Sequence, residues 1–554
     1  MATPTKYRTE FLVNATTNAD QYGPAITGLP NGRFVATWTD TSGTAPDFSI
    51  CSRAQIFNAD GSRFGAEFVV NTTTNDGQLQ PEITALSGGG FAVTFLDLSQ
   101  LNTGPDFSNI RVQVFDVVGT KIGGDFVAPA TSVGNQTEPV IAKLHLGRYV
   151  VAWTDSSATG GDTSGDAIRS QVFNADGTRF GAEVLVNTTT AGSQQDAAVT
   201  ALANGNYVVG WSSRSANIDG IAYNTVYSQV FRPNGSKLGG EYVASTIAGL
   251  MIGQDSPDIT GLAGGRYVLT WNDTSHYQTD ILGQMFNPNG TPHGAVFMAN
   301  ATTAFDQTDS TTTALPDGGF VVAWVDSGLP LAGRFNPEIR AQVFHASGAR
   351  SGAEILVNTD TTGLQRAPSV AALADGRFVV TWEDLGGGPG DSTFAIRAQI
   401  FDGRSAAINL TGTAGADTYV GTKFNDRVAG LAGRDVLAGG AGDDILRGGT
   451  GRDLLTGGAG LDTFVFATAA EAGLGTARDR ITDFKHGADH LDFSAFMAGG
   501  HFIGSAPIAA GDGPQVRFNA GTGVLQGDVT GDGTVDFALT LDGGPALTDV
   551  DFVF

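Results

Sequence analysis

Aspartate returns every nine residues across a glycine-rich stretch between residues 412 and 465. Six consecutive nonapeptides carry it at their sixth place: GTAGADTYV, GTKFNDRVA, GLAGRDVLA, GGAGDDILR, GGTGRDLLT and GGAGLDTFV. Ca²⁺ takes about six to eight oxygens from carboxylates and backbone carbonyls, and glycine lets successive carbonyls turn toward one ion. A flexible Gly-rich linker, the alternative, would not keep aspartate and an apolar residue in phase over six repeats. The stretch therefore predicts a set of oxygen ligands for a divalent cation.

This register matches G-G-x-G-x-D-x-U-x, where U is a large apolar residue, and so resembles the repeats of the calcium-binding RTX family. The resemblance implies a parallel β-roll, in which each repeat forms a metal-binding half-turn and a short strand. Roughly four ions would lie between repeats n and n+2, held by carbonyls of places one to four and by the sixth-place carboxylate. Phe424 and Asn425 replace the usual glycines in the second repeat, which puts ligation at that turn in doubt. The implied ligands are Asp417, Asp426, Asp435, Gly440, Gly442, Asp444, Gly449, Gly451, Asp453, Gly458, Gly460 and Asp462.

Such a segment should fold only with its metal. Without calcium the aspartates repel one another, and a single row of aliphatic residues such as Leu437, Leu446 and Leu455 cannot offset the chain entropy of so many glycines. Extracellular modules of this kind bind calcium in the range of about 10⁻⁴–10⁻³ M, far above resting cytosolic levels. We therefore expect calcium binding to be coupled to folding, with an unfolded segment before export and a folded one after it.

The segment after the repeats, residues 462–496, extends the resemblance to the C-terminal domain of serralysin-type secreted proteases. It shares a D-x-F-x-F exit strand, D-x-I-x-D-F at 479–484 and G-x-D-x-L-D-F at 487–493. The catalytic zinc motif of that family is absent, so proteolysis is not carried over with the tail. Asp483 and Asp489 are expected as additional calcium ligands, and charged loop residues are the alternative.

The end of the chain predicts its route out of the cell. The final residues, DVDFVF, resemble the uncleaved C-terminal signal of type I secretion substrates. The N-terminus lacks the basic and apolar regions of a Sec-type signal peptide, and the single cysteine, Cys51, excludes an intramolecular disulfide framework. We expect a secreted protein of a Gram-negative bacterium, extracellular or associated with the cell surface. Asp528, Asp532 and Asp536 resemble a truncated EF-hand loop, for which a structural role is preferred.

We expect any function beyond metal binding and export to lie in the first 404 residues, which are built from seven copies of one unit. A Gln-aliphatic-Phe triplet recurs with its glutamine at Gln55, Gln113, Gln171, Gln229, Gln284, Gln342 and Gln399. Each unit contains four short stretches with period-two alternation, which in the first unit are EFLVN, PAITGL, GRFVATWTD and SRAQIFN. Seven four-stranded units predict a β-propeller. Because no EFLVN-type strand follows Phe401, residues 10–14 should complete the last blade.

Polar residues recur in every blade, and a structural role is the preferred interpretation of them. Each unit has an aromatic anchor about 15 to 20 residues before its Gln-aliphatic-Phe triplet, and in most units an aspartate two residues after the anchor opens a variable loop such as residues 41–50. The anchors are Trp38, Phe95, Trp153, Trp211, Trp271, Trp324 and Trp382. The face formed by these loops would suit sugar hydroxyls or a cation, and turn capping is the alternative. The described aspartates are Asp40, Asp97, Asp155, Asp273, Asp326 and Asp384. The chain has no HExxH, GxSxG or P-loop motif, so a binding module is favoured over the rival, a propeller polysaccharide hydrolase or lyase.

Composition limits the partners. Acidic residues outnumber basic ones 56 to 31, giving a formal charge of −25 that repels nucleic acid and anionic membranes, and no apolar run is long enough to span a membrane. The expected partners are calcium, the type I secretion machinery and an extracellular glycan or surface protein. We therefore expect an all-β chain in three parts: a seven-bladed propeller over 1–404, an RTX β-roll over 405–466, and a β-sandwich-like secretion domain over 467–554.

Overall fold

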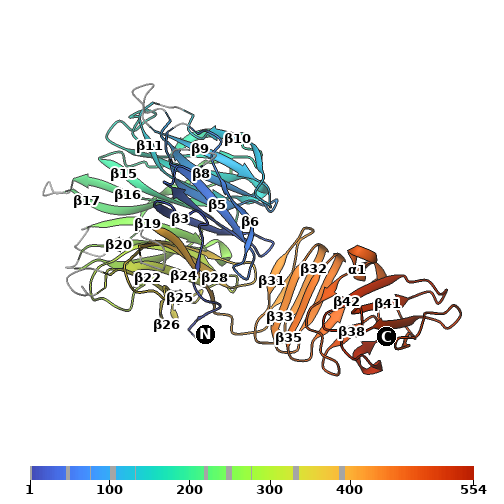
Figure 1. Cartoon of the computed structure of the whole chain (residues 1–554). Coiled ribbons are helices and arrows are strands. Elements are labelled where there is room, and N and C mark those ends of the chain that lie inside the picture. Colours follow the sequence, from blue (N-terminus) through green and yellow to red (C-terminus); the bar gives the residue numbers. More distant parts are fainter. Residues whose placement is uncertain are drawn as a thin grey trace.

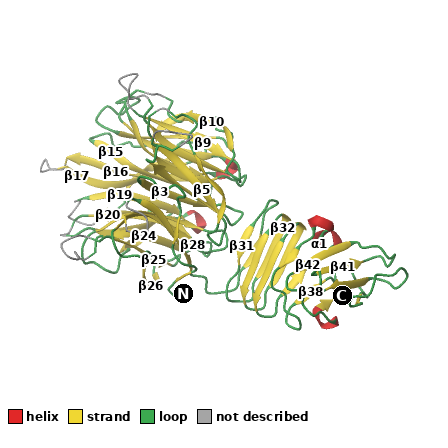
Figure 2. Cartoon of the chain, in the orientation of Figure 1, coloured by secondary structure: helices red, strands yellow, loops and turns green. Residues whose placement is uncertain are grey.

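The protein is almost entirely β-structure, arranged as a propeller followed by a roll (Figures 1 and 2). The computed structural model describes residues 3–44, 50–74, 76–99, 108–130, 133–216, 222–244, 253–275, 278–328, 336–385 and 393–554. The helical elements of these residues are α1 (Ala469–Ala472) and four 3₁₀ turns, at His145–Gly147, Ala263–Gly265, Gly475–Ala477 and Asp549–Asp551. No helix within the described parts is long and apolar enough to cross a membrane.

Seven antiparallel sheets of the predicted kind form the propeller. The strands of blades one to three are β3 (Gln21–Gly28), β4 (Phe34–Asp40), β5 (Cys51–Phe57), β6 (Arg63–Val69), β7 (Gln78–Ala85), β8 (Phe91–Asp97), β9 (Asn109–Phe115), β10 (Lys121–Val127), β11 (Gln136–Lys143), β12 (Tyr149–Asp155), β13 (Ala167–Phe173) and β14 (Arg179–Leu185). Those of blades four to six are β15 (Ser193–Ala201), β16 (Tyr207–Ala216), β17 (Ala222–Phe231), β18 (Lys237–Val243), β19 (Gln254–Gly261), β20 (Tyr267–Asp273), β21 (Asp280–Phe286), β22 (Pro292–Met298), β23 (Gln307–Ala314), β24 (Phe320–Asp326), β25 (Glu338–Phe344) and β26 (Arg350–Leu356). Blade seven contains β27 (Leu364–Ala372), β28 (Phe378–Leu385) and β29 (Ala395–Asp402).

The N-terminal segment closes the ring, as the strand count predicts. Strands β1 (Thr5–Lys6) and β2 (Phe11–Leu12) both pair antiparallel with β29, with Phe11 opposite Ala398. The outer strands of the other blades begin earlier than the EFLVN pattern predicts: β6 starts at Arg63, whereas the equivalent stretch, EFVVN, covers residues 67–71. The reason is a bulge, because left-handed Gly65 (φ 70°) lets the chain re-enter pairing with β5 directly after the turn at Gly61.

The hydrophobic core of the propeller lies between neighbouring blades. One cluster joins Phe34 and Trp38 of blade one to Val379 and Ile396 of blade seven, and each is fully buried. Equivalent clusters connect the other blades, and the six tryptophan anchors all have 0% exposed surface. Each blade therefore stabilises the next, and the ring needs every blade, including the strands supplied by the N-terminus.

Two sheets of the roll face one another across a single core. The first roll sheet contains β30 (Asn409–Thr411), β32 (Arg427–Gly433), β34 (Ile445–Gly451), β36 (Thr463–Val465), β38 (His490–Asp492) and β43 (Phe552–Val553), in that order. The second roll sheet contains β31 (Thr418–Val420), β33 (Val436–Ala441), β35 (Leu454–Ala459), β37 (Arg480–Ile481), β42 (Phe537–Leu541), β41 (Val524–Asp528), β40 (Gln515–Asn519) and β39 (His501–Phe502). Parallel pairing of alternate repeats gives a solenoid of about six turns over residues 409–516.

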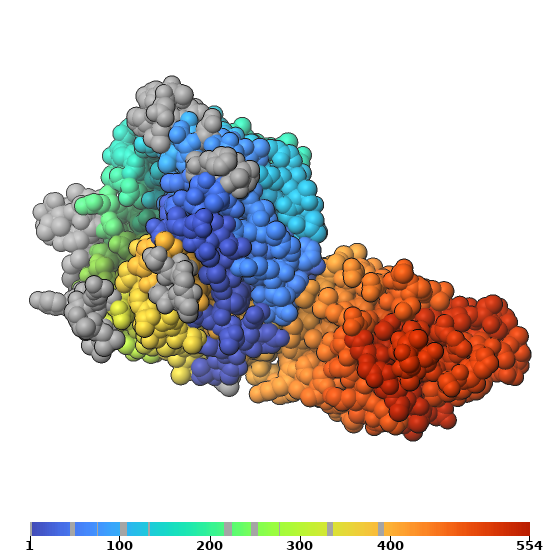
Figure 3. All heavy atoms as spheres, in the orientation of Figure 1, coloured from blue at the N-terminus to red at the C-terminus, as the bar shows by residue number. Residues whose placement is uncertain are grey.

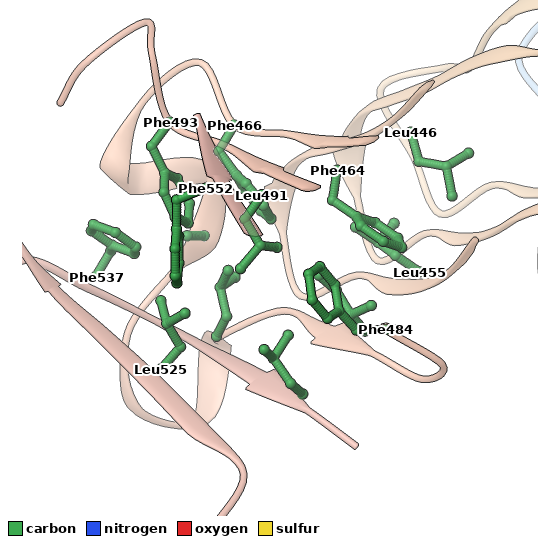
Figure 4. Packing of buried hydrophobic residues seen from close by; sticks show 14 of the residues in the cluster. Leu446, Leu455, Phe464, Phe466, Phe484, Leu491, Phe493, Leu525, Phe537 and Phe552 are labelled. Carbon is green, nitrogen blue, oxygen red and sulfur yellow. The ribbon is translucent and has the colours of Figure 1, made fainter. Parts of the chain in front are cut away.

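The eighth-place apolar residues fill the roll and lead into an aromatic cluster. Leu446 and Phe464 of the first roll sheet and Leu455 of the second point into the same core, and Phe493 and Phe552 continue that core toward the C-terminus (Figure 4). The eighth-place residues thus form two facing rows where the sequence predicts a single one. Both sheets run across residue 466, so the last ninety residues extend the roll in a sandwich-like way.

The roll is attached to the propeller through its first turns (Figure 3). Arg404 donates to the carbonyls of Val420 and Gly421, both at 2.7 Å. The Thr418 N–H donates to the Asn31 carbonyl (2.8 Å) at the edge of the second roll sheet. The propeller thus covers the open sheet edge at which a solenoid would otherwise expose unpaired backbone groups.

Candidate metal centre

The sixth-place aspartates form two hydrogen-bonded rows, one beside each roll sheet. In the first, the Asp417 row, the Asp417 N–H donates to Asp435 Oδ1 (2.8 Å), and the Asp435 N–H donates to Asp453 Oδ1 (2.8 Å). In the second, the Asp426 row, the same bond joins Asp426 to Asp444 (2.7 Å) and Asp444 to Asp462 (3.0 Å). One oxygen of each carboxylate therefore fixes the stacking of coils, which leaves the other oxygen for a different partner.

Both rows continue past the nonapeptides. The Asp453 N–H donates to Asp479 Oδ1 (2.7 Å), and the Asp462 N–H donates to Asp489 Oδ1 (3.1 Å). Asp479 is absent from the sequence prediction because helix α1 and its flanking residues interrupt the nine-residue period. A local signal in the sequence could have found it. Asp479 is followed two residues later by the buried Ile481, and Asp489 by the buried Leu491, just as each sixth-place aspartate is followed by an inward apolar residue.

The remaining carboxylate oxygens are buried and unsatisfied. Within the described parts of the chain, Oδ2 makes no hydrogen bond in five aspartates: Asp435, Asp444, Asp453, Asp462 and Asp479. Native proteins rarely leave a buried polar atom without a partner, and such an atom commonly marks the place of an ion or water. These five oxygens therefore fit a cation.

Burial of the carboxylates disfavours their charged form. Desolvation, with repulsion from neighbouring carboxylates in the same row, raises the pKa of Asp435 and of Asp444 to about 7. The pKa of Asp453 rises to about 6 and that of Asp479 to about 9, again chiefly through burial. A bound cation reverses this balance, because it stabilises the charged form that burial opposes.

Backbone oxygens converge beside these carboxylates. A Cβ at first-place Gly430 or Gly439 would come closer than 3.0 Å both to the sixth-place Oδ2 of its own repeat and to a glycine carbonyl two repeats on. The predicted second- and fourth-place glycines are all left-handed, with φ from 96° to 148°: Gly440, Gly442, Gly449, Gly451, Gly458 and Gly460. The donor set is thus carboxylate and carbonyl oxygen, the chemistry that Ca²⁺ prefers.

The first two repeats have a different arrangement. Thr413 and Thr422 occupy the second place, and each hydroxyl donates to the aspartate of its own turn, Asp417 or Asp426, at 3.0 Å. Their N–H groups bond the second oxygen of the same carboxylates. Asp417 and Asp426 therefore have protein partners for both oxygens, so their role as ligands stays a prediction without the support that the five unpartnered oxygens give.

The two ligands predicted beyond the repeats differ from each other. Asp483 accepts from the N–H groups of Gly457 (2.9 Å) and Gly458 (2.8 Å), so it anchors a neighbouring coil. Asp489 ends the Asp426 row, and its Oδ2 accepts from the Lys485 N–H (2.8 Å). Asp528 closes its own loop by accepting from the N–H groups of Gly531 (2.7 Å) and Gly533 (2.8 Å). No group of three or more His, Cys, Asp or Glu side chains has a metal-binding arrangement within the described ranges.

In the propeller, the recurring polar residues bond to one another. Asp40 is fully buried, pairs with Arg53 and accepts from Gln21 Nε2 (3.2 Å). Arg53 also contacts Glu67 (3.1 Å), and Glu67 accepts from the Thr16 hydroxyl (2.8 Å) at the end of the N-terminal strand segment. The structural interpretation therefore holds for Asp40, although residues 45–49 of the loop that it opens lie outside the described residues.

The inner strands carry a feature that the sequence reasoning missed. Each has a bulge with a left-handed residue, and these residues form a ring: Gly23, Gln80, Glu138, Asp196, Ser256, Asp309 and Ala367. A cavity of about 320 Å³ lies between the inner strands, and four of these residues, Gly23, Gln80, Glu138 and Ala367, line it together with Glu82. The side chain of Glu82 is exposed to this cavity, but the surrounding blades desolvate it, and with repulsion from Asp258 they raise its pKa to about 8.

Comparison with known proteins assigns the C-terminal part. The family described as peptidase M10 serralysin C terminal matches residues 379–554. Metallopeptidase AprA of Pseudomonas marginalis is 40% identical over 91 residues, which are 16% of this chain and 19% of AprA, so the match spans about a fifth of that relative.

Solved structures resemble the fold more weakly. The GH93 α-L-arabinofuranosidase of Fusarium graminearum is 13% identical with a TM-score of 0.44, and the alignment covers 62% of this chain and 99% of the enzyme. A protein of unknown function from Dyadobacter fermentans is 12% identical with a TM-score of 0.42, over 72% of this chain and 99% of that chain. Likeness at this level carries no inference about activity. The family match, the nonapeptides and the parallel solenoid together show that the C-terminal part of this chain is a serralysin C-terminal domain of the RTX type, joined to a seven-bladed β-propeller.

Proposed function

We propose that this is a secreted calcium-binding RTX protein whose C-terminal part folds on calcium after type I export. The observation that carries the proposal is the set of five buried Oδ2 atoms without a partner, beside converging glycine carbonyls. Calcium would supply the positive charge that these oxygens lack. Asp435, Asp453 and Asp479 would hold ions along one row, and Asp444 and Asp462 along the other.

The protein's own residues prepare these places. The Oδ1 hydrogen bonds hold each carboxylate in line with the next coil, and the left-handed glycines let the coils stack closely enough for carbonyls to approach. Ordering these coils costs backbone entropy of about 1–2 kcal/mol per residue, and glycine has the most to lose. The metal-free roll therefore favours the unfolded chain, and binding free energy becomes folding free energy.

The C-terminal residues support export in the unfolded state. Phe552 is buried in the roll core and stacks on Phe554, with ring centroids 5.4 Å apart. Asp551 is fully buried and accepts from the Gly487 N–H (2.8 Å). A signal in this tail would be accessible only before the roll folds, which agrees with low cytosolic calcium and with an extracellular, Gram-negative location. Removing residues 549–554 should retain the protein in the cell, and normal export would contradict the assignment.

For the propeller, we propose binding of an extracellular glycan or surface protein at the polar ring around the central cavity. All seven inner strands have a left-handed residue at this position, and such a conformation costs free energy in any residue other than glycine. In most blades the residue is polar, as in Gln80, Glu138, Asp196 and Asp309. A hydrolase or lyase is the second candidate, because carboxylates line the same cavity. A polysaccharide panel assayed for retention and for new reducing or unsaturated ends separates the two, since a binding module gives retention alone.

Calcium titration by calorimetry tests the main proposal on the full chain. We expect several ions to bind with midpoints of about 10⁻⁴–10⁻³ M, accompanied by a gain of β-structure in circular dichroism. Binding with no spectral change would leave calcium as a ligand but refute coupled folding. Absence of binding would refute the proposal as a whole.

A further inference from the structure

Arginines line one edge of the roll, in a chain whose net charge is −25. Arg434 and Arg452 stand two residues before Val436 and Leu454, which are opposite each other in the second roll sheet. Leu454 is in turn opposite Arg480, so Arg478 is the next in register after Arg452. Neighbouring strands are about 4.8 Å apart. The arginine row, defined as Arg434, Arg452 and Arg478, therefore places three arginines at equivalent backbone positions of successive coils along the roll axis.

The opposite edge of the roll lacks this charge. The equivalent residues beside the first roll sheet are Asn425, Asp443 and Leu461, each one place before an aspartate of the Asp426 row. Asp443 and Asn425 bond along that edge, because the Asp443 N–H donates to Asn425 Oδ1 (3.0 Å). The two edges share a backbone and differ in side chains, so coil stacking alone does not require the arginine row.

Two members of the row are unpaired. Arg434 and Arg452 are exposed, and neither side chain makes a hydrogen bond or ion pair with any residue that the structure describes. Arg478 is held in place, since its Nε donates to Thr540 Oγ1 (2.7 Å) and its Nη1 to the Gly475 carbonyl (2.8 Å). One arginine is thus preorganised, and two are free to meet an incoming anion.

The row borders a groove of about 610 Å³. Arg452, Arg478 and Arg480 line it, and its one carboxylate, Asp542, is already paired with Arg480 (2.8 Å). The other lining residues are Gly475, Thr476 and Thr540. Guanidinium groups bind carboxylate and sulfate oxygens in a bidentate manner, while threonine hydroxyls suit sugar hydroxyls.

We propose that this groove and the arginine row bind a linear acidic glycan, a sugar chain bearing carboxylates or sulfates. Regular cationic spacing over three coils fits repeated charges on a polymer better than a single small anion. Duplex nucleic acid is disfavoured, because its dense negative charge, one phosphate per about 1.7 Å of helix axis, is repelled by the strongly acidic protein outside the groove. This site lies on the roll, apart from the propeller cavity, and it requires only that the roll is folded.

The test uses the full chain at saturating calcium, with retention measured on immobilised hyaluronate, dextran sulfate and uncharged dextran. Hyaluronate presents carboxylates and dextran sulfate presents sulfates, so the preferred column identifies the anion. The wild-type protein should be retained on at least one charged glycan and released by salt. The triple variant Arg434→Gln, Arg452→Gln, Arg478→Gln should bind about tenfold more weakly, as expected for three exposed charge pairs of about 0.5 kcal/mol each.

Arg427→Gln is the matched control, because Arg427 is exposed and unpaired within the described residues but lies in the first roll sheet. It should change retention less than twofold. The double variant Arg434→Gln, Arg452→Gln removes no hydrogen bond or ion pair between described residues, and its retention should still fall several-fold. Three results would overturn the proposal: Arg427→Gln weakens binding as much as the triple variant, uncharged dextran retains the protein equally well, or the calcium-folded protein is not retained at all. Tighter binding of duplex DNA than of any glycan would overturn the choice of a glycan. Circular dichroism of each variant distinguishes these results from a failure of calcium-dependent folding.

Discussion

The propeller and the roll both bury rows of aspartates, and they balance the charge in opposite ways. In five blades an arginine of the third strand pairs with the aspartate, as Arg53 does with Asp40 and Arg169 with Asp155. In the roll, five aspartates have an unpartnered oxygen and only backbone N–H groups on the other. The propeller supplies its own counter-ions as arginines, whereas in the function proposed above the roll takes its cation from solution. Stability should therefore be built in for one region and conditional for the other.

The largest effect should come from removing three members of the Asp417 row. The variant Asp435→Asn, Asp453→Asn, Asp479→Asn keeps the shape of the side chains but removes the charge that a cation needs. The calcium concentration at which the roll folds should rise more than tenfold, while the metal-free roll should become easier to fold because repulsion is gone. A calcium titration followed by circular dichroism measures both. Asp512→Asn, at an exposed position of the same part, is the control and should leave the midpoint unchanged.

The next effect is independent of calcium and leaves the propeller folded but less stable. Arg169→Met leaves Asp155 buried without its cation, which should cost about 3–5 kcal/mol of unfolding free energy. All six tryptophans lie between residues 38 and 382, so urea unfolding followed by tryptophan fluorescence reports on the propeller alone. In the double variant with Asp155→Asn, part of the loss should be recovered. A strictly additive double variant, or a loss that calcium restores, would break the contrast between the two regions.

The smallest effect is expected at an exception to this contrast. Glu82 is a carboxylate of the propeller, in its central cavity, and it has no arginine partner among the described residues. The surrounding blades desolvate Glu82 and raise its pKa from 4.5 to about 8, so the folded state holds a proton that the unfolded state releases. The side chain is exposed to the cavity, so screening by water keeps the effect on stability small. This contribution to stability is complete below pH 4.5 and is lost as the pH rises through 8. Glu82→Gln should flatten the pH dependence of the propeller melting temperature over that window. An unchanged slope would show that cavity water already solvates the carboxylate.

Repetition explains how much of this molecule could be predicted from its sequence. Seven copies of the Gln55-type triplet predict the blades, and the missing last strand predicts closure by Phe11 and Leu12. Six nonapeptides likewise predict the coils and the inward position of Leu446 and Leu455, although these two residues lie in opposite sheets of the roll.

What the sequence did not predict was set by individual contacts that the repeat pattern does not contain. Asp479 joins the Asp417 row only because β37 pairs with β35 across an inserted helix. The threonines of the first two repeats alter their turns by hydrogen bonds that the period alone does not reveal. The bulge ring and the arginine row likewise depend on register between strands, which a repeat pattern fixes only after folding.

Hydrogen exchange of the full chain, with calcium and with excess chelator, tests the central claim most directly. Amides of residues 427–465 should be strongly protected in calcium and exchange within seconds in chelator, because the metal-free coils have unpaired buried carboxylates and no alternative counter-ion. Amides of the propeller strands, such as those of β4 and β12, should be equally protected in both conditions. Protection of residues 427–465 that persists in chelator would contradict the account, because the roll would then fold without bound calcium.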